Sequence, residues 1–163
     1  MAYDASRSLE QKYRSAVAGL YARLKSNYDT ICEEFGDEGI KLIANMSRRY
    51  GLEVAERARK KVKGDDIKSV GEYIIRIFET VGVEVEVAEV NENRMVIKVA
   101  YCPLNFDKPE MCLAHTVMEE AVVEGLNPNL TYRIGKSIPA GDPYCEHIIE
   151  TRTHLKHKEE RKD

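Results

Sequence analysis

The fold is decided by residues 83–102, which read VEVEVAEVNENRMVIKVAYC. Valine and glutamate alternate through the first part of this stretch, and a period of two is typical of a half-buried strand. Residues 91–94 supply a polar turn, and residues 95–102 return as an apolar-rich partner strand. The stretch therefore predicts an antiparallel β-hairpin.

The chain before this hairpin has the period of amphipathic helices. Apolar residues recur at intervals of three and four over residues 6–27, 37–63 and 69–82. Gly51 is expected to bend or split the second helix, since glycine costs about 1 kcal/mol relative to alanine inside a helix. Ser69 and Glu72 have the spacing of a capping box that opens the third helix, and Gly82 is well placed to end it.

The chain after the hairpin contains one more helix and two more strands. Asp107 and Glu110 have capping spacing at the start of a helix that runs to about Glu124 and stops at Gly125. Residues 130–138 and 144–152 are predicted strands joined by a turn rich in proline and glycine. Because helices come first and strands later, we expect an α+β fold. Its antiparallel sheet has about four strands, with one helix inserted between two hairpins.

The length of the chain predicts a single domain. That domain spans residues 1–152, with a helical part over 1–82 and an α+β part over 83–152, and residues 153–163 form a charged tail. The apolar stripe of the first helix is expected to pack either within the chain or on a second copy. The sequence therefore leaves open whether the protein forms a homo-oligomer.

Composition excludes several classes of partner. The chain has 25 basic and 28 acidic residues, a formal charge of −3, so no basic field predicts nucleic acid. No apolar run approaches the roughly 20 residues that span a bilayer, and no signal-peptide core is found, so we expect no membrane partner and a cytoplasmic location. In that compartment thiols stay reduced, and the four cysteines predict free thiols or a metal site.

Five side chains that can bind a soft metal fall in the second half of the chain. Cys112 and His115 are three apart on a predicted helix, and Cys145 and His147 are two apart on a predicted strand, so each pair shares a face. Cys102 ends the preceding strand. If the helix packs on the sheet, all five converge. Zinc binds such donors, four in a structural site or three plus water in a catalytic site, so the set predicts zinc.

A metal-free site is an alternative reading of the same residues. Cys112 lies in the first turn of its helix, where the helix dipole favours a thiolate, so it is the nucleophile candidate. His115 or His147 would pair with it, near the acidic groups of Glu119 or Asp142.

Two further interpretations stay open. Free cysteines are among the most often buried residues, so each cysteine alone is also explained by core packing. Arg133 and Lys136 lie on or near a predicted strand, where they are candidates to bind a substrate carboxylate or to be ordinary exposed residues.

Short motifs in this region carry a resemblance to a known family. They are Cys102-Pro103-Leu104, Pro109-Glu110-Met111-Cys112, Leu126-Asn127-Pro128 and Gly141-Asp142-Pro143-Tyr144-Cys145, preceded by the helical EEFGDEGIKLI of residues 33–43. With them the chain resembles the L-2-amino-thiazoline-4-carboxylic acid hydrolase family over about residues 30–150. The resemblance implies hydrolytic opening of a cyclic amidine to a carbamoyl-cysteine. It also implies that the three cysteines and the aspartate of these motifs match family positions.

The last motif is also similar, more distantly, to 4-vinyl-reductase-like domains. That resemblance implies a non-catalytic module that binds a small molecule and has a cysteine-bearing metal site. A purely structural zinc is a third reading. The shape of the site separates them: a binding module needs an apolar cavity, and a hydrolase needs polar groups that converge on an open metal or thiol.

Overall fold

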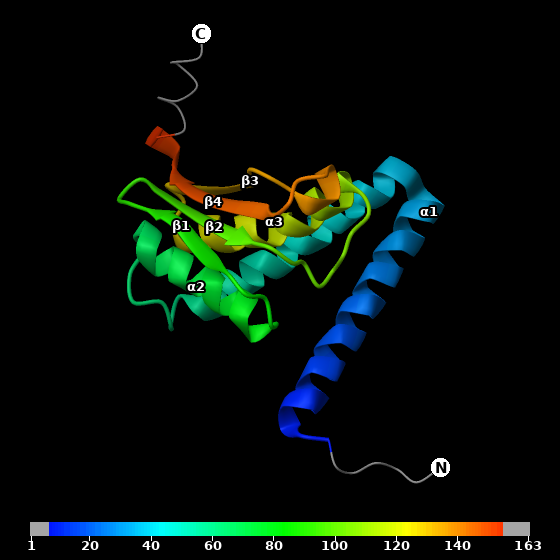
Figure 1. Cartoon of the computed structure of the whole chain (residues 1–163). Helices are drawn as coiled ribbons and strands as arrows, with labels where there is room; N and C mark the ends of the chain where they lie inside the picture. The colour runs from blue at the N-terminus through cyan, green and yellow to red at the C-terminus, as the bar shows by residue number, and fades with distance from the viewer. Residues whose placement is uncertain (1–6, 155–163) are drawn as a thin grey trace.

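The computed structural model describes residues 7–154, and it confirms the α+β fold (Figure 1). The elements are α1 (Leu9–Ala58), α2 (Ile67–Thr80), β1 (Glu86–Val90), β2 (Arg94–Val99), α3 (Pro109–Leu126), β3 (Leu130–Ile134), the short 3-10 helix η1 (Ile138–Ala140) and β4 (Cys145–Thr151). Of the predicted charged tail, residues 155–163 lie outside the described residues.

The four strands form one antiparallel sheet in the order β1-β2-β4-β3. The predicted hairpin is β1 and β2, the second hairpin is β3 and β4, and α3 connects them. One face of the sheet, here called the inner face, faces the helices. It presents the alternate residues Met95, Ile97 and Val99 of β2 beside Ile149, His147 and Cys145 of β4.

The helices pack in two layers beneath the inner face. α2 and α3 contact the sheet, and the second part of α1 packs along α3 (Figure 1). The first part of α1, residues 9–35, is called the arm below. Its portion near the bend packs on the body, and its N-terminal end extends away from it (Figure 1). None of the helices formed by residues 7–154 combines the length and apolar character needed to cross a membrane.

The two predicted N-terminal helical stretches are present as the two parts of α1, but the predicted bend at Gly51 is wrong. α1 is broken at Gly36, whose φ of 54° is a left-handed conformation that glycine adopts without steric cost. Gly51 lies in regular helix and instead permits close contact, because a Cβ there would lie 2.3 Å from the carbonyl oxygen of Met118 on α3. A Cβ on Gly125 would lie 2.6 Å from Cβ of Ala55. Small residues thus let α1 and α3 approach.

Two predicted helix starts are also corrected. α2 begins at Ile67, and the Asp66 side chain accepts hydrogen bonds from two backbone N–H groups at its N-terminus, so the predicted box at Ser69 is not the cap. Asp107 does not cap α3; it forms an ion pair with Lys25 of the arm at 2.9 Å. The predicted stop at Gly125 is wrong by one residue, because α3 continues to Leu126.

The strands are shorter than their sequence patterns predict. β1 begins at Glu86 and is mostly exposed, because it is an edge strand that pairs with β2 alone. β3 ends at Ile134, since residues 138–140 turn into η1 and Gly141 follows with a φ of 97°. Gly82, with a φ of 77°, comes directly after Val81, the C-cap of α2, and marks the end of that helix as predicted.

Candidate functional site

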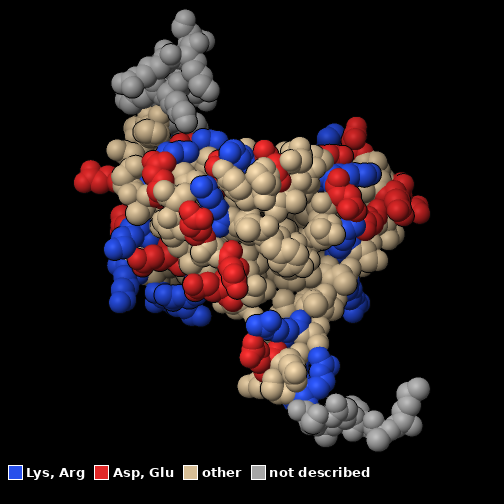
Figure 2. All heavy atoms as spheres, viewed as in Figure 1, with Lys and Arg blue, Asp and Glu red and all other residues tan. Residues whose placement is uncertain are grey.

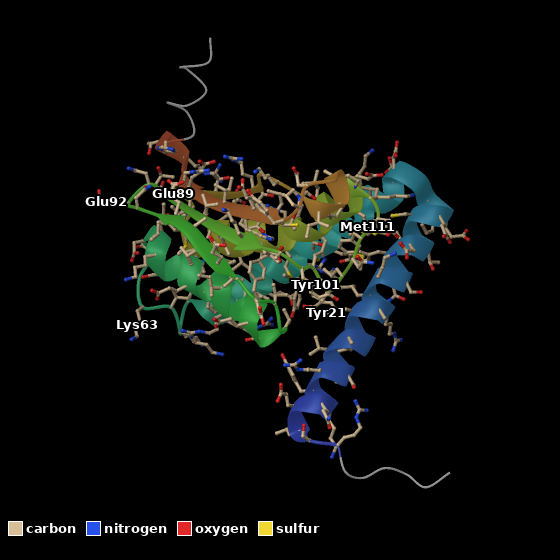
Figure 3. All side chains as sticks on the ribbon, viewed as in Figure 1. Tyr21, Lys63, Glu89, Glu92, Tyr101 and Met111 are labelled. Atoms are coloured by element: carbon tan, nitrogen blue, oxygen red, sulfur yellow. The ribbon has the colours of Figure 1, made fainter. Side chains whose placement is uncertain are left out.

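A cavity of about 530 Å³ lies between α1, α2, α3, the loop after β2 and the inner face of the sheet. Its volume falls in the range of small-molecule sites, roughly 300–1,000 Å³. The wall is mainly aromatic and aliphatic, and its rings are Tyr21, Tyr28, Tyr50, Phe78 and Phe106, with two histidines. Tyr21 lies on the side of the arm that faces the body (Figure 3).

One face of α3 supplies most of the polar groups in this wall. Cys112, His115, Thr116 and Glu119 are spaced at i, i+3, i+4 and i+7, so they share a helix face, and all four line the cavity. The sequence placed Cys112, His115 and Glu119 on one face. It did not indicate Thr116, although the same spacing includes it.

The sheet and the loop after β2 complete the site. Cys145 and His147 alternate with outward residues of β4 and therefore both point to the inner face, where they line the cavity. Cys102 lines it from the loop after β2. The structure therefore brings all five predicted metal donors, together with Glu119, to one cavity.

Both histidines are neutral at physiological pH. Burial lowers the pKa of His115 and of His147 to about 4. The hydroxyl of Tyr28 lies 3.3 Å from Nδ1 of His115, and the hydroxyl of Tyr132 hydrogen-bonds Nδ1 of His147. Neither histidine supplies the cavity with a positive charge.

The thiols of Cys112 and Cys145 are protonated as well. Burial raises the pKa of Cys112 to about 11, and the neighbouring thiols of Cys145 and Cys102 add to the rise. Burial also raises the pKa of Cys145, although the N–H of Ile138 donates to its sulfur at 3.3 Å. The expected stabilisation of a Cys112 thiolate by the helix N-terminus is therefore outweighed by burial.

Glu119 is the one carboxyl group among the described residues of the cavity wall. Glu119 is only 5% exposed, and its Oε2 has no hydrogen-bond partner within the part of the chain that the structure describes. Burial raises its pKa to about 8, so it is mostly protonated at neutral pH. The whole cavity is thus close to electrically neutral.

The predicted metal ligands are neighbours in the cavity but do not form a metal centre. Among residues 7–154, no group of three or more His, Cys, Asp or Glu side chains is arranged to hold a metal ion. Zinc therefore stays a prediction from sequence, and no step below depends on it.

Three other predicted site residues lie outside the cavity wall. Arg133 pairs with Glu150 at 2.7 Å, and the Lys136 ammonium donates to the Tyr144 hydroxyl at 2.8 Å. Asp142 accepts a hydrogen bond of 2.8 Å from the backbone N–H of Ser137, which organises the turn before β4. Their predicted catalytic and carboxylate-binding roles stay predictions.

Several residues of the wall were not found from the sequence. Tyr28 and Phe106 stack with their ring centroids 5.9 Å apart, and both approach the ring of His115. Tyr21 and Tyr28 are seven residues apart, the spacing of one helix face, which was a usable signal. The signal did not show that the bend at Gly36 would place that face against the loop after β2.

A family model for L-2-amino-thiazoline-4-carboxylic acid hydrolase matches residues 18–149, which include β1 to β3, most of β4 and every cavity residue named above. The chain belongs to this hydrolase family. No curated protein sequence matches the chain.

Two solved structures share the fold of this hydrolase-family chain. One is the phenol-responsive sensory domain of the transcription activator PoxR with phenol. It has a TM-score of 0.58 and 16% identity, and the match covers 83% of this chain and 74% of that one. The other is trafficking protein particle complex subunit 3 from Naegleria fowleri, covalently bound to palmitic acid. Its TM-score is 0.63 and its identity 12%, covering 84% of this chain and 95% of that one. The fold is consistent with that of 4-vinyl-reductase-like domains.

Proposed function

We propose that the protein binds one small, largely apolar molecule in the cavity. The observation that supports this most is the cavity wall, which within residues 7–154 contains no lysine, arginine or aspartate. Burial holds its histidines, the thiols of Cys112 and Cys145 and its single carboxyl group in their neutral forms. A ring-lined space without a basic side chain favours a largely apolar ligand, because an anionic ligand would lose its hydration without gaining an opposite charge.

The structural relatives support the same proposal. One is described with phenol and the other with covalently bound palmitic acid, and both share the fold. Their ligands are a ring and an acyl chain, each mostly apolar. Ligand identity does not transfer at 12–16% identity, but a cavity in this fold is compatible with such occupants.

A cavity-filling variant tests the proposal. Thr116→Phe puts a ring into the cavity from α3, and Leu113→Phe puts the same ring on the exposed side of the same helix. Toluene should raise the melting temperature of the wild type and of Leu113→Phe, since a ligand at 100 times its Kd stabilises by about 2.7 kcal/mol. It should not raise that of Thr116→Phe. The absence of any toluene effect on the wild type would contradict the proposal.

Hydrolysis in the same cavity is the second candidate. The family supports it, and Cys112, His115 and Glu119 share one helix face on the cavity. Glu119, with its pKa raised to about 8, is a proton donor at neutral pH. The test is conversion of 2-amino-thiazoline-4-carboxylic acid and water to a carbamoyl-cysteine, followed by mass spectrometry. Unchanged turnover by Cys112→Ser would remove the predicted nucleophile, and metal analysis of the same protein tests the predicted zinc.

Self-association through the arm also stays a prediction. Leu9 and Leu20 on the arm are 82% and 69% exposed, so an apolar stripe faces solvent. Sedimentation of the wild type and of a Leu9→Glu, Leu20→Glu variant measures whether the arm associates. A cytoplasmic location likewise stays a prediction from sequence.

A further inference from the structure

We propose that Glu119 selects the ligand of the proposed binding function, and that this ligand carries an amine or amidine nitrogen and no carboxylate. The proposal rests on the binding function above and identifies its ligand class. It is carried by the placement of one unpaired acid in a cavity that has no basic side chain among its described wall residues.

The carboxyl group of Glu119 has an unused hydrogen-bonding atom. The residue is 5% exposed, and the side chain lines the cavity from α3. Oε2 finds no hydrogen-bond partner anywhere in the described chain. Buried polar atoms in native proteins are nearly always satisfied, so an atom left open beside a ligand-sized cavity indicates that the ligand supplies the partner.

The groups that face Glu119 do not supply a positive charge. The groups close enough to interact electrostatically with Glu119 are Tyr21 and Tyr28 from α1, Cys112 from α3 and Tyr132 from β3. The other titratable groups of the cavity wall are His115 from α3, Cys145 and His147 from β4, and Cys102 from the loop after β2. Burial keeps the phenols and the thiols of Cys112 and Cys145 protonated, and the histidines neutral.

A carboxylate ligand would therefore enter a neutral wall without a cation to pair with, which opposes its binding. An ammonium or amidinium group would find the Glu119 carboxylate and the faces of Tyr21, Tyr28 and Phe106, which attract cations. An amidine edge presents two parallel N–H groups, the same arrangement by which arginine binds a carboxylate with two hydrogen bonds. The geometry therefore favours the amidine most.

The proton balance of binding follows from the same groups. Glu119 holds a proton at neutral pH before the ligand enters, because burial raises its pKa to about 8. When a protonated amidine binds, the carboxyl proton leaves to solvent and an ion pair with no net charge remains in the cavity. Binding should therefore release close to one proton per ligand at pH 7.

Three nearly isosteric probes test the proposal on the full chain: benzamidine, a cation; benzamide, neutral; and benzoate, an anion. By titration calorimetry at pH 7 we expect benzamidine to bind at least about tenfold more tightly than benzoate, with benzamide between them. Calorimetry in two buffers of different ionisation enthalpy should show the release of a proton with benzamidine alone. These measurements use the wild type, so they do not depend on the folding of a variant.

Variants of two adjacent acids then assign the selectivity to one residue. Glu119→Gln should lower benzamidine affinity about tenfold and abolish proton release, and should change benzamide affinity by less than about threefold. Glu120→Gln is the matched control, because Glu120 follows on α3 and is not among the cavity-lining residues. Its benzamidine affinity should equal that of the wild type.

Two results would overturn the proposal. Benzoate binding as tightly as benzamidine would do so, and so would a Glu119→Gln variant that keeps the preference for benzamidine. Toluene separates this failure from failure of the binding function. If toluene stabilises the protein but benzamidine has no advantage, the cavity binds ligands and the role of Glu119 is wrong. If toluene has no effect either, both proposals fail.

Discussion

Two glutamates lie out of reach of solvent on opposite sides of the sheet, and the protein surrounds them differently. Glu150, fully buried on the outer face of β4, has the Nε of Arg133 at 2.7 Å and the Nε of Arg94 at 3.7 Å. Glu119, 5% exposed on α3, faces the cavity with Oε2 unpartnered among residues 7–154. Neither Oε2 atom has a hydrogen-bond partner in the described chain, but Glu150 has two guanidinium groups beside it and Glu119 has none.

The difference indicates that Glu150 stabilises the fold and that Glu119 does not. The partners of Glu150 come from the adjacent strands β2 and β3, so its charge is balanced by the same pairing that builds the sheet. Glu119 has no such neighbour, and burial instead keeps it protonated. An unpaired buried acid lowers the stability of the empty protein, which is typical of a group held for a ligand.

The largest change in stability is expected when the paired carboxylate of Glu150 is neutralised. Glu150→Gln leaves Arg94 and Arg133 facing a neutral amide, and loss of one partner from a buried ion pair costs roughly 3 kcal/mol. We expect the free energy of unfolding in urea to fall by about that amount. Glu124→Gln is the control, because its partners Arg48 and Arg152 are nearly half exposed, and it should cost within about 1 kcal/mol. Equal losses for the two variants would contradict the structural role of Glu150.

The dependence of stability on pH is the second test. The pKa of Glu119 is about 8 when folded and 4.5 ordinarily, so between these values the folded chain holds a proton that the unfolded chain releases. Stability from this group therefore falls as pH rises, by about 2 kcal/mol from pH 6.5 to pH 8. Thermal melts should show this decline in the wild type. Glu119→Gln should remove it, and parallel profiles for the two proteins would show that Glu119 is not the cause.

Below pH 6.5 the two buried histidines have the opposite effect on stability. The folded pKa values of His115 and His147 are about 4, against an ordinary 6.5, so stability falls as pH drops from 6.5 towards 4. Two histidines outweigh one glutamate there, so the wild type should be most stable near pH 6.5. A maximum displaced to pH 8 or above would contradict the burial of Glu119 in its neutral form.

The smallest effect is expected from removing the unpaired acid itself. Glu119→Met has a similar shape and no polar atom to leave unsatisfied, so it should raise the free energy of unfolding by about 1 kcal/mol at pH 7. Chemical denaturation measures the change. A loss of stability instead would mean that Glu119 contributes to the fold as Glu150 does, and the contrast between the two would disappear.

Much of this fold was predictable from local pattern. The alternation around residues 83–102 predicted the hairpin, and helical spacing placed Cys112, His115 and Glu119 on one face of α3. The break in α1 was not placed correctly, because Gly36 and Gly51 look alike in sequence. One needs a left-handed φ, and the other allows close contact with a helix that lies about 70 residues later in the chain.

The sequence by itself determined the α+β class, the two hairpins and the residues that share each face, because periods of 2 and 3.6 depend only on neighbours along the chain. Only the tertiary structure decided the chemistry of the site. It left the metal donors without a metal-holding arrangement in residues 7–154, paired Arg133 with Glu150 away from the cavity, and left Glu119 without a partner for Oε2. The charge state of a side chain depends on its burial and on partners that are distant in sequence, and the spacing of residues along the chain reveals neither.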